Sequence, residues 1–376
     1  MDFAEYFNSH QEEMLQLLEK MVTQESPSTD KKAVDRCSGF LIKEFRKLGT
    51  KITRFPQRHI GDLYLVEYLP SKSEEKKEQV LILTHLDTVW PVGKLKEMPF
   101  HIKGKKVYGP GVLDMKAGLI MVLFALKALK EKTVKLKKKI AIFINSAEEI
   151  GSKDSYRVIQ KIAKKSSFAL CLEPAMPGGN LKMQRKGRLV IRLEAQGKAA
   201  HGGTPEAGIN AIEELVGQFR LLNKLRTKGT TVNIGVFRGG EKSNVVPKDA
   251  WALLDIRFWK NSQKQKILDF FKHLAPRLEG ARIKFSVESY TPPMEKTDAS
   301  LKLFRKIRKI GYSLNMALEA GKTGGGSDAS IAANMGIPTV DGLGPDGVGI
   351  HAENEHLILP SLIKRAALLT ELLIHL

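Results

Sequence analysis

The stretch "VLILTHLDTVW", from Val80 to Trp90, decides the fold. Four apolar residues that are typical of a buried strand lead into His85, and Asp87 follows two places later. Around this stretch, helical patterns alternate with short apolar runs, which is typical of an α/β sheet with helices on both faces. Ligands of such sheets gather beyond the carboxyl ends of the strands. We therefore expect this strand to end at a functional site.

The remaining patterns predict two domains. Up to residue 183, helices are expected over 12–24, 31–49 and 116–131, and strands over 62–69, 79–85, 139–145 and 167–173. The next segment has strands expected over 187–197, 230–239, 244–259 and 281–290, with helices over 208–225 and 262–279. Its order, β-α-β-β-α-β, is that of a ferredoxin-like split unit. We predict a catalytic domain with a mixed, largely parallel sheet over 1–183 and 293–376, interrupted by a smaller domain over 184–292.

Length and composition favour a globular protein. The 376 residues exceed one typical core, and no apolar run approaches the roughly 20 residues that span a bilayer. The N-terminal segment is acidic and amphipathic, unlike a secretory signal. Cys37 and Cys171 are too few for a disulfide framework, so reduced thiols are expected. These features predict a cytoplasmic protein without a membrane partner.

The net charge of +20 admits an acidic partner such as nucleic acid. However, the lysines are scattered or lie in short runs such as "KLKKK", Lys135 to Lys139, without interleaved aromatic residues or a nucleic-acid motif. A solvated, lysine-rich surface is therefore favoured, and no nucleic-acid partner is expected. The positive field would still help to collect small acidic substrates.

Potential metal ligands recur at the ends of the expected strands and in glycine-rich loops. They are His85, Asp114, Glu149, Glu173 and His351. Two imidazoles and three carboxylates exceed what one tetrahedral zinc ion needs. They suit two zinc ions ~3.5–4 Å apart that share a carboxylate. Co²⁺ and Mn²⁺ remain possible, because carboxylate-rich sites accept several metals.

Two further carboxylates have positions that favour catalysis. Asp87 lies two residues after His85, which puts both side chains on one face of an extended chain, where the carboxylate can orient the imidazole. Glu148, beside Glu149, is placed to take a proton from an attacking water molecule and to pass it to a leaving amine.

Several of these residues also have a structural interpretation. His85 alone would be read as a core histidine with a satisfied hydrogen bond. Glu148 and Glu149 would favour a helix N-terminus, and Asp114 would cap the helix that follows it. From the residues alone, His351 is not distinguished from His356, five positions later.

Seven motifs in order resemble the dinuclear zinc family of aminoacylases, acetylornithine deacetylase, succinyl-diaminopimelate desuccinylase and glutamate carboxypeptidase, with the glutamate carboxypeptidase branch most similar. The motifs are "THLDTV", "GPGVLDMKAG", "NSAEEIGS", "LEP", "AAHGGTPEAGINAI", "SNVVP" and "GGGSDAS" with the final "GIHAENE". The resemblance covers nearly the whole chain. It implies a zinc-peptidase-like catalytic domain and an inserted dimerisation domain that closes as a lid and forms a homodimer.

The resemblance also implies a role for each candidate. His85 and Glu173 would hold one zinc ion, Glu149 and His351 would hold the other, Asp114 would bridge them, Asp87 would orient His85, and Glu148 would be the general base and acid. A cis peptide bond is often found after the bridging aspartate, here between Asp114 and Met115.

In the inserted domain, His201 resembles a histidine that reaches the partner subunit's active site and stabilises the oxyanion. Asn244 and Arg257 resemble residues that contact the substrate carboxylate or the developing charge. Without the resemblance, His201 would be read as a loop histidine bonded locally, and Arg257 as a partner of Asp255 or Asp249. The loop that includes Gly325 and Gly326 would shape the substrate pocket through its backbone N–H groups.

The sequence departs from the glutamate carboxypeptidase pattern in two places. Lys322 stands where an arginine is common, and lysine cannot form the same two-pronged contact with a carboxylate. No arginine lies near "SYTPPMEK", where glutamate-specific members have one. We therefore expect zinc-dependent hydrolysis of an amide or peptide bond in a small carboxylate-bearing substrate, as in a carboxypeptidase. The alternatives are an N-acyl amino acid deacylase and, more remotely, a catalytically silent relative that binds amino-acid derivatives.

Overall fold

The computed structural model describes residues 2–68 and 78–376, which divide into two compact units. The first unit comprises residues 1–183, 296–323 and 327–376, and the second comprises residues 184–295 with Gly324–Gly326. Each unit has its own hydrophobic core. The dimerisation and lid roles expected of the inserted segment stay predictions.

The first unit is built on a mixed sheet with the strand order β1-β2-β6-β3-β7-β14. The strands are β1 (Lys51–Phe55), β2 (Leu63–Tyr68), β3 (Gln79–His85), β6 (Lys139–Asn145), β7 (Ser166–Cys171) and β14 (Thr339–Val340). The last four strands in the sheet order pair in parallel, whereas β1 and β2 pair antiparallel. Every residue of β3 is buried, as expected for a central strand covered on both faces.

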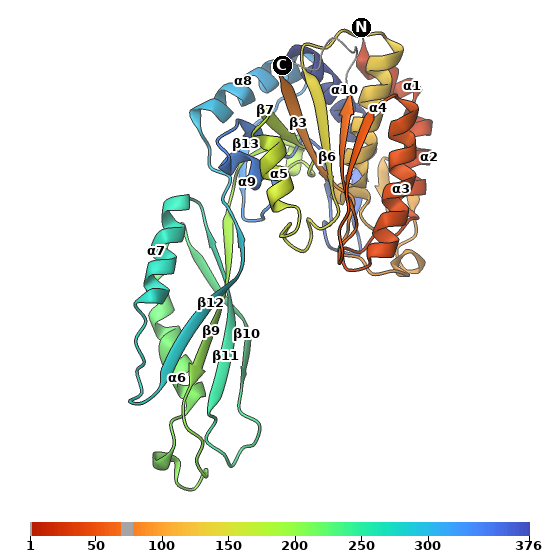
Figure 1. The fold of residues 1–376 in the computed structure, drawn as a ribbon. Helices are drawn as coiled ribbons and strands as arrows, with labels where there is room; N and C mark the ends of the chain where they lie inside the picture. The colour runs from red at the N-terminus through yellow and green to blue at the C-terminus, as the bar shows by residue number, and fades with distance from the viewer. Residues whose placement is uncertain (1, 69–77) are drawn as a thin grey trace. The chain divides into compact units, whose positions relative to one another are not determined.

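Helices cover both faces of this sheet (Figure 1). One side carries α1 (Phe3–Ser9), α2 (Gln11–Val22), α3 (Lys31–Lys47), α4 (Ala117–Glu131) and α10 (Leu359–His375). The other side carries α5 (Tyr156–Ala163) and α9 (Asp328–Asn334), and α8 (Asp298–Ser313) packs near β14. Helix α4 is apolar around nearly its whole circumference because it packs against α2, α10 and β3.

Short strands hold the loops at one edge of the first unit. A second sheet has the order β15-β16-β5-β4, formed by β4 (His101–Lys103), β5 (Lys106–Tyr108), β15 (Gly347–Val348) and β16 (His356–Ile358). Strands β8 (Leu181–Arg185) and β13 (Ala320–Thr323) form a further pair. These strands were not predicted, because most of them are too short to show a pattern in the sequence.

The second unit has the predicted β-α-β-β-α-β order. It consists of β9 (Gly187–Gln196), α6 (Ala211–Leu221), β10 (Thr231–Gly239), β11 (Asp249–Phe258), α7 (Asn261–Lys272) and β12 (Arg282–Thr291). The sheet is antiparallel with the order β10-β11-β9-β12. Both helices lie on one face of it (Figure 1), and the residues of β9 and β11 alternate between buried and partly exposed. This arrangement confirms the ferredoxin-like prediction.

The two largest errors in the predicted boundaries lie in the second unit. The strand expected from residue 244 begins at Asp249, since Pro247 has no amide hydrogen to donate to a sheet. The helix expected up to residue 279 ends at Lys272, because Pro276 disfavours helical conformation in the residue before it.

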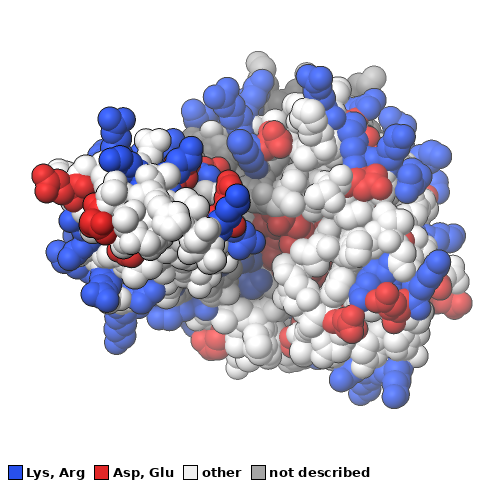
Figure 2. Space-filling view, turned by 90° about the horizontal axis from the view of Figure 1, so that it is seen from below, with Lys and Arg blue, Asp and Glu red and all other residues white. Residues whose placement is uncertain are grey.

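The surface agrees with a solvated distribution of charge. On the face shown in Figure 2, Lys and Arg side chains are spread widely with Asp and Glu between them. Among the helices of residues 2–68 and 78–376, none combines the length and apolar character required to cross a membrane.

Candidate metal centre

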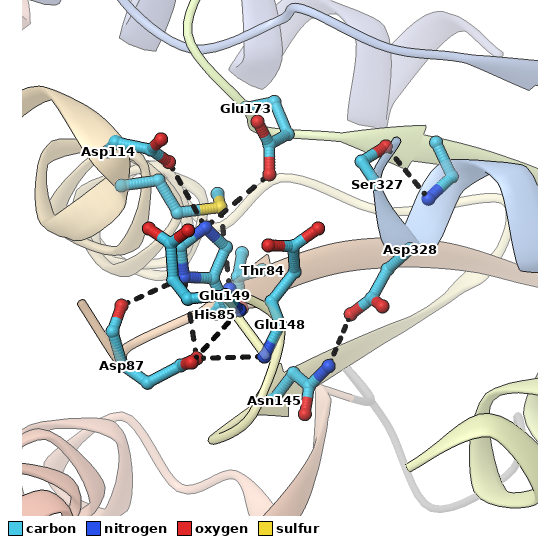
Figure 3. A network of polar contacts seen from close by, with 12 residues as sticks. Thr84, His85, Asp87, Asp114, Asn145, Glu148, Glu149, Glu173, Ser327 and Asp328 are labelled. Carbon is cyan, nitrogen blue, oxygen red and sulfur yellow. Dashed lines mark hydrogen bonds and ion pairs between the residues drawn. The ribbon is translucent and has the colours of Figure 1, made fainter. Parts of the chain in front are cut away.

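His85 is the centre of the first half of the site. It ends β3, is 1% exposed, and points its Nε2 atom toward two carboxylates. This nitrogen lies 3.1 Å from Oδ1 of Asp114 and 3.4 Å from Oε1 of Glu173 (Figure 3). Glu173 follows β7, the strand adjacent to β3, so neighbouring parallel strands bring the two residues together.

Asp114 presents one oxygen to each of the two candidate histidines. While Oδ1 faces His85, Oδ2 lies 3.4 Å from Nε2 of His351. The residue lies in a buried turn just before α4, and the peptide bond to Met115 is cis, as the resemblance implied. This is the arrangement required of a carboxylate shared by two ions.

The second half of the site joins Glu149 to His351. Nε2 of His351 lies 3.2 Å from Oε1 and 3.0 Å from Oε2 of Glu149. His351 has a φ angle of +61°, which is uncommon for a residue other than glycine. His356, the alternative, has Nδ1 2.8 Å from the carbonyl oxygen of Asn354, and its ring packs against Tyr108 at an interplanar angle of 33°.

Asp87 positions the loop that carries Glu148 and Glu149. Its carboxylate accepts hydrogen bonds from both backbone N–H groups, at 3.1 Å each (Figure 3), and from the Ser28 hydroxyl at 2.6 Å. Nδ1 of His85 lies 3.0 Å from the carbonyl oxygen of Asp87 and 3.5 Å from its carboxylate. Thus the Asp87 backbone is nearer to the ring than the carboxylate that we expected to orient it.

Asp328 anchors both ends of the loop that carries Glu148 and Glu149, and it was not predicted from the sequence. Its buried carboxylate accepts hydrogen bonds from Asn145 at 2.7 Å (Figure 3) and from Ser152 at 2.5 Å, so it fixes both ends of the segment 145–152. The signal was present in "GGGSDAS", but only the glycines of that motif were considered. The contact of Ser28 with Asp87 was not predicted, because Ser28 lies in none of the motifs.

Clustered carboxylates dominate the electrostatics. Burial raises the pKa of Glu148 well above its ordinary value, and the charge of Glu173 adds to the rise. Burial also raises the pKa of Glu149, to about 7. Hydrogen bonds with Asp114 and Glu149 raise the pKa of His351 to about 10. A negative potential that favours protonated groups also attracts divalent cations.

The donor set therefore fits metal ions. Two groups of three side chains have ligand atoms within 4.8 Å of one another: His85 with Glu148 and Glu173, and His85 with Asp114 and Glu149. Imidazole nitrogens and carboxylate oxygens are the ligands that zinc and related divalent ions take in catalytic sites. The chain thus offers enough donors at this edge of the sheet for two ions.

Most of the residues that were predicted to contact the substrate or the oxyanion lie in the second unit. His201 is exposed, and its Nδ1 accepts a hydrogen bond from the Gly203 N–H at 3.0 Å. The adjacent Gly202 N–H donates to the carbonyl oxygen of Asn244 at 2.8 Å, so the loops of these two candidates lie together.

Arg257 and the glycine loop also contact each other. Arg257 donates to Asp255 at 3.0 Å and to the carbonyl oxygen of Gly324 at 2.8 Å. The carbonyl oxygens of Gly325 and Gly326 accept hydrogen bonds from Arg185 at 3.2 Å and 2.7 Å.

Lys322 lies in β13, in the first unit. Cys171 is buried at the end of β7, as expected for a small core residue.

Comparison with known proteins gives the family. The chain matches peptidase family M20/M25/M40 over residues 81–375. Carboxypeptidase G2 from Pseudomonas sp. (strain RS-16) is 30% identical over 365 residues, covering 94% of this chain and 86% of that protein. Succinyl-diaminopimelate desuccinylase from Buchnera aphidicola subsp. Cinara cedri (strain Cc) is 27% identical, covering 87% and 90%.

A solved structure shows the same fold. The YXEP protein of Bacillus subtilis, described as a dinuclear metal binding peptidase of the M20 family, aligns with a TM-score of 0.74 and 16% identity, covering 97% of this chain and 98% of that one. The chain belongs to peptidase family M20/M25/M40. It is a metal-dependent hydrolase that acts on amide or peptide bonds.

Proposed function

We propose that this protein is a two-metal carboxypeptidase that hydrolyses the amide bond next to a free carboxylate in a small substrate. The observation that carries the proposal is the position of Asp114, with one carboxylate oxygen toward His85 and the other toward His351. The similarity to carboxypeptidase G2 supports the same conclusion.

The proposed ligands form two sets around Asp114. His85 and Glu173 would hold one ion, Glu149 and His351 would hold the other, and Asp114 would bridge them. When bound, two zinc ions polarise the scissile carbonyl group and lower the pKa of a water molecule at the site. Co²⁺ or Mn²⁺ would serve the same donors.

Glu148 is the proposed proton carrier. A general base must lie near the proton that it takes, and its pKa must be close to the working pH. Glu148 meets the first condition because its ligand atom belongs to the cluster of His85 and Glu173. Burial raises its pKa above the ordinary value, which is the direction that the second condition requires. It would accept the proton of the attacking water and deliver it to the leaving amine.

The second unit would complete the site in a homodimer. We propose that His201 of one subunit stabilises the oxyanion in the partner's site, as the family resemblance implies. Asn244 and Arg257, with Lys322 and the Gly325–Gly326 loop, would contact the carboxylate of the substrate. The support is chemical, since cations and N–H groups are the usual partners of carboxylates.

A deacylase is the second candidate function. Succinyl-diaminopimelate desuccinylase is similar over most of its length, and Lys322 departs from the arginine expected of glutamate carboxypeptidases. A carboxypeptidase and a deacylase of this family would cleave the same kind of bond with the same catalytic residues. They differ in whether the acyl side of the substrate is a peptide or a simple acid.

A hydrolysis screen tests the proposal. Zinc-loaded protein is incubated with dipeptides that end in glutamate, aspartate or a neutral residue, and with acetyl and succinyl amino acids. We expect the dipeptides to be cleaved with the highest kcat/KM, and cleavage to stop on chelation. Turnover confined to acetyl or succinyl amino acids would favour the deacylase. Bound metal without any turnover would favour a silent relative.

A further inference from the structure

Glu355 is a buried carboxylate outside the proposed ligand set. It lies at the end of the loop that carries His351, immediately before β16, and is 1% exposed. A buried charge of this kind is costly unless hydrogen bonds satisfy it. Its partners therefore show what it stabilises.

Four donors converge on this carboxylate. Oε1 accepts hydrogen bonds from the backbone N–H groups of Leu113, at 3.0 Å, and Asp114, at 3.1 Å. Oε2 accepts from the backbone N–H of Gly111, at 2.9 Å, and from the indole N–H of Trp90, at 2.8 Å. Two oxygens with two acceptor sites each are filled by four donors.

The partners belong to the segments that carry the proposed ligands. Gly111, Leu113 and Asp114 form the turn that presents the bridging carboxylate, and Trp90 follows the segment of His85 and Asp87. Gly111 has a φ angle of +70°, and a Cβ atom there would lie 2.4 Å from the Thr88 side chain, so this position of the turn requires glycine.

We propose that Glu355 is a positioning residue for the metal pair: its carboxylate fixes the Asp114 turn against the loops of His85 and His351 and thereby sets the affinity for both ions. This inference rests on the proposed function, because it assumes that Asp114 and His351 are ligands. Glu355 itself touches neither substrate nor metal. Lys116 holds the far end of the same turn, with Nζ donating to the carbonyl oxygens of Met21, at 3.0 Å, and Gln24, at 2.9 Å.

The test uses Glu355→Gln, which keeps the shape but replaces one acceptor oxygen with an NH₂ group that faces two donors. Zn²⁺ affinity is measured by competition with a chelator, and the ligand field is followed by the visible spectrum of the Co²⁺ form. We expect affinity to fall by about 10–100-fold, as for other groups that orient metal ligands. We also expect kcat to recover in excess Zn²⁺ with KM nearly unchanged.

The matched control is Glu214→Gln in the second unit. Glu214 is also fully buried, and its carboxylate accepts from the backbone N–H groups of Arg277 and Leu278 and from Gln218. Glu214→Gln should lower the temperature of unfolding without changing the affinity for Zn²⁺. Wild-type affinity in folded Glu355→Gln would overturn the proposal.

Three outcomes are separated by the same experiment. If Glu355→Gln does not fold, Trp90→Phe decides, since it removes one donor only: weaker Zn²⁺ binding supports the proposal, and unchanged binding overturns it. If the wild type binds no pair of ions, the proposed function fails. If the wild type binds two ions and hydrolyses its substrate but Glu355→Gln matches it, only the positioning role fails.

Discussion

Glu148 and Glu149 are neighbours whose carboxylates face different groups. Glu149 contacts His351, whereas Glu148 lies with His85 and Glu173. Adjacent carboxylates with different surroundings can take different roles, one as ligand and one as base. The division follows from the Asp87 hydrogen bonds, which fix both backbone N–H groups and so set the direction of each side chain.

This division predicts that similar substitutions of the two glutamates have different effects on metal binding. Glu148→Gln should lower kcat by about 10²–10⁴-fold, the usual contribution of a general base, and should leave the bound metal in place. Glu149→Gln, its matched control, should lower the metal content as well. Both are checked by elemental analysis beside steady-state kinetics. A Glu148→Gln enzyme with the wild-type rate would contradict the assignment.

Asp62 predicts how stability depends on pH away from the site. It is 1% exposed, accepts hydrogen bonds from Lys31 and the Gln57 N–H, and pairs with Arg54. Burial opposes ionisation, but these partners outweigh it and lower the pKa. A depressed pKa contributes stability above the unfolded pKa of about 4, and this contribution is lost as pH falls through the folded value.

Asp62→Asn should therefore destabilise the protein by about 2 kcal/mol at pH 7, the scale of hydrogen bonds to a charged group. The difference from wild type should shrink below pH 4. Urea unfolding at several pH values measures both. Glu44→Gln is the control, because Glu44 pairs with an exposed Lys47 and such pairs contribute little. A difference that grows at low pH would contradict the sign.

The sequence revealed the ligand candidates but not the residues that position them. His85, Glu149 and Glu173 could be found because ligands follow the ends of parallel strands. Asp328 and Glu355 act through backbone N–H groups and loop side chains of segments far away in the chain, and no local pattern reports such contacts. Both lie inside motifs that were noticed for other residues.

At the scale of elements, the loop 145–152 is held by α9. Asp328 is the first residue of that helix and binds Asn145 and Ser152, so the helix and the loop are one unit. Burial raises the pKa of Asp328 to about 6, against the hydrogen bonds that lower it. The contact links α9 to the two glutamates proposed for catalysis and metal binding.

Asp328→Asn should loosen this loop and lower kcat about tenfold, the lower end of the range for groups that orient metal ligands. Asp298→Asn is a close control, because Asp298 is also the first residue of a helix after a hydroxyl cap, but it is exposed. The contribution of the helix dipole is therefore similar at the two positions. Steady-state kinetics compares kcat of the two variants. Equal activity of the two variants would show that the loop is fixed by other contacts.

For the whole molecule, the two-domain fold could be predicted because each part has its own pattern. Strands such as "VLILTH" and "KIAIFIN" are apolar along their length, whereas β9 alternates, and these patterns distinguish a covered sheet from a sheet with one open face. The glycine segment Gly324–Gly326 could not be assigned to the second unit from the sequence, because residues far away in the chain, such as Arg185 and Arg257, contact it there.

The proposed dimer gives a prediction at this scale. If His201 of one subunit serves the partner's site, Glu148→Ala and His201→Ala subunits have complementary defects. Their heterodimer contains one site with an intact Glu148 and an intact His201. Random pairing makes half of the dimers mixed, with one good site in two, so a co-expressed mixture should regain about a quarter of the wild-type activity.

The control is a mixture of Glu148→Ala and Asp114→Ala, in which every site lacks one residue of its own subunit, so that no activity should return. Subunits with different affinity tags allow the mixed dimer to be purified and its rate measured directly. The purified heterodimer should have about half of the wild-type rate, since one of its two sites is complete. If His201 acted within its own subunit, neither site of the heterodimer would be complete. A mixed dimer as inactive as its parents would therefore exclude the shared site, whereas the metal centre of the first unit would stand.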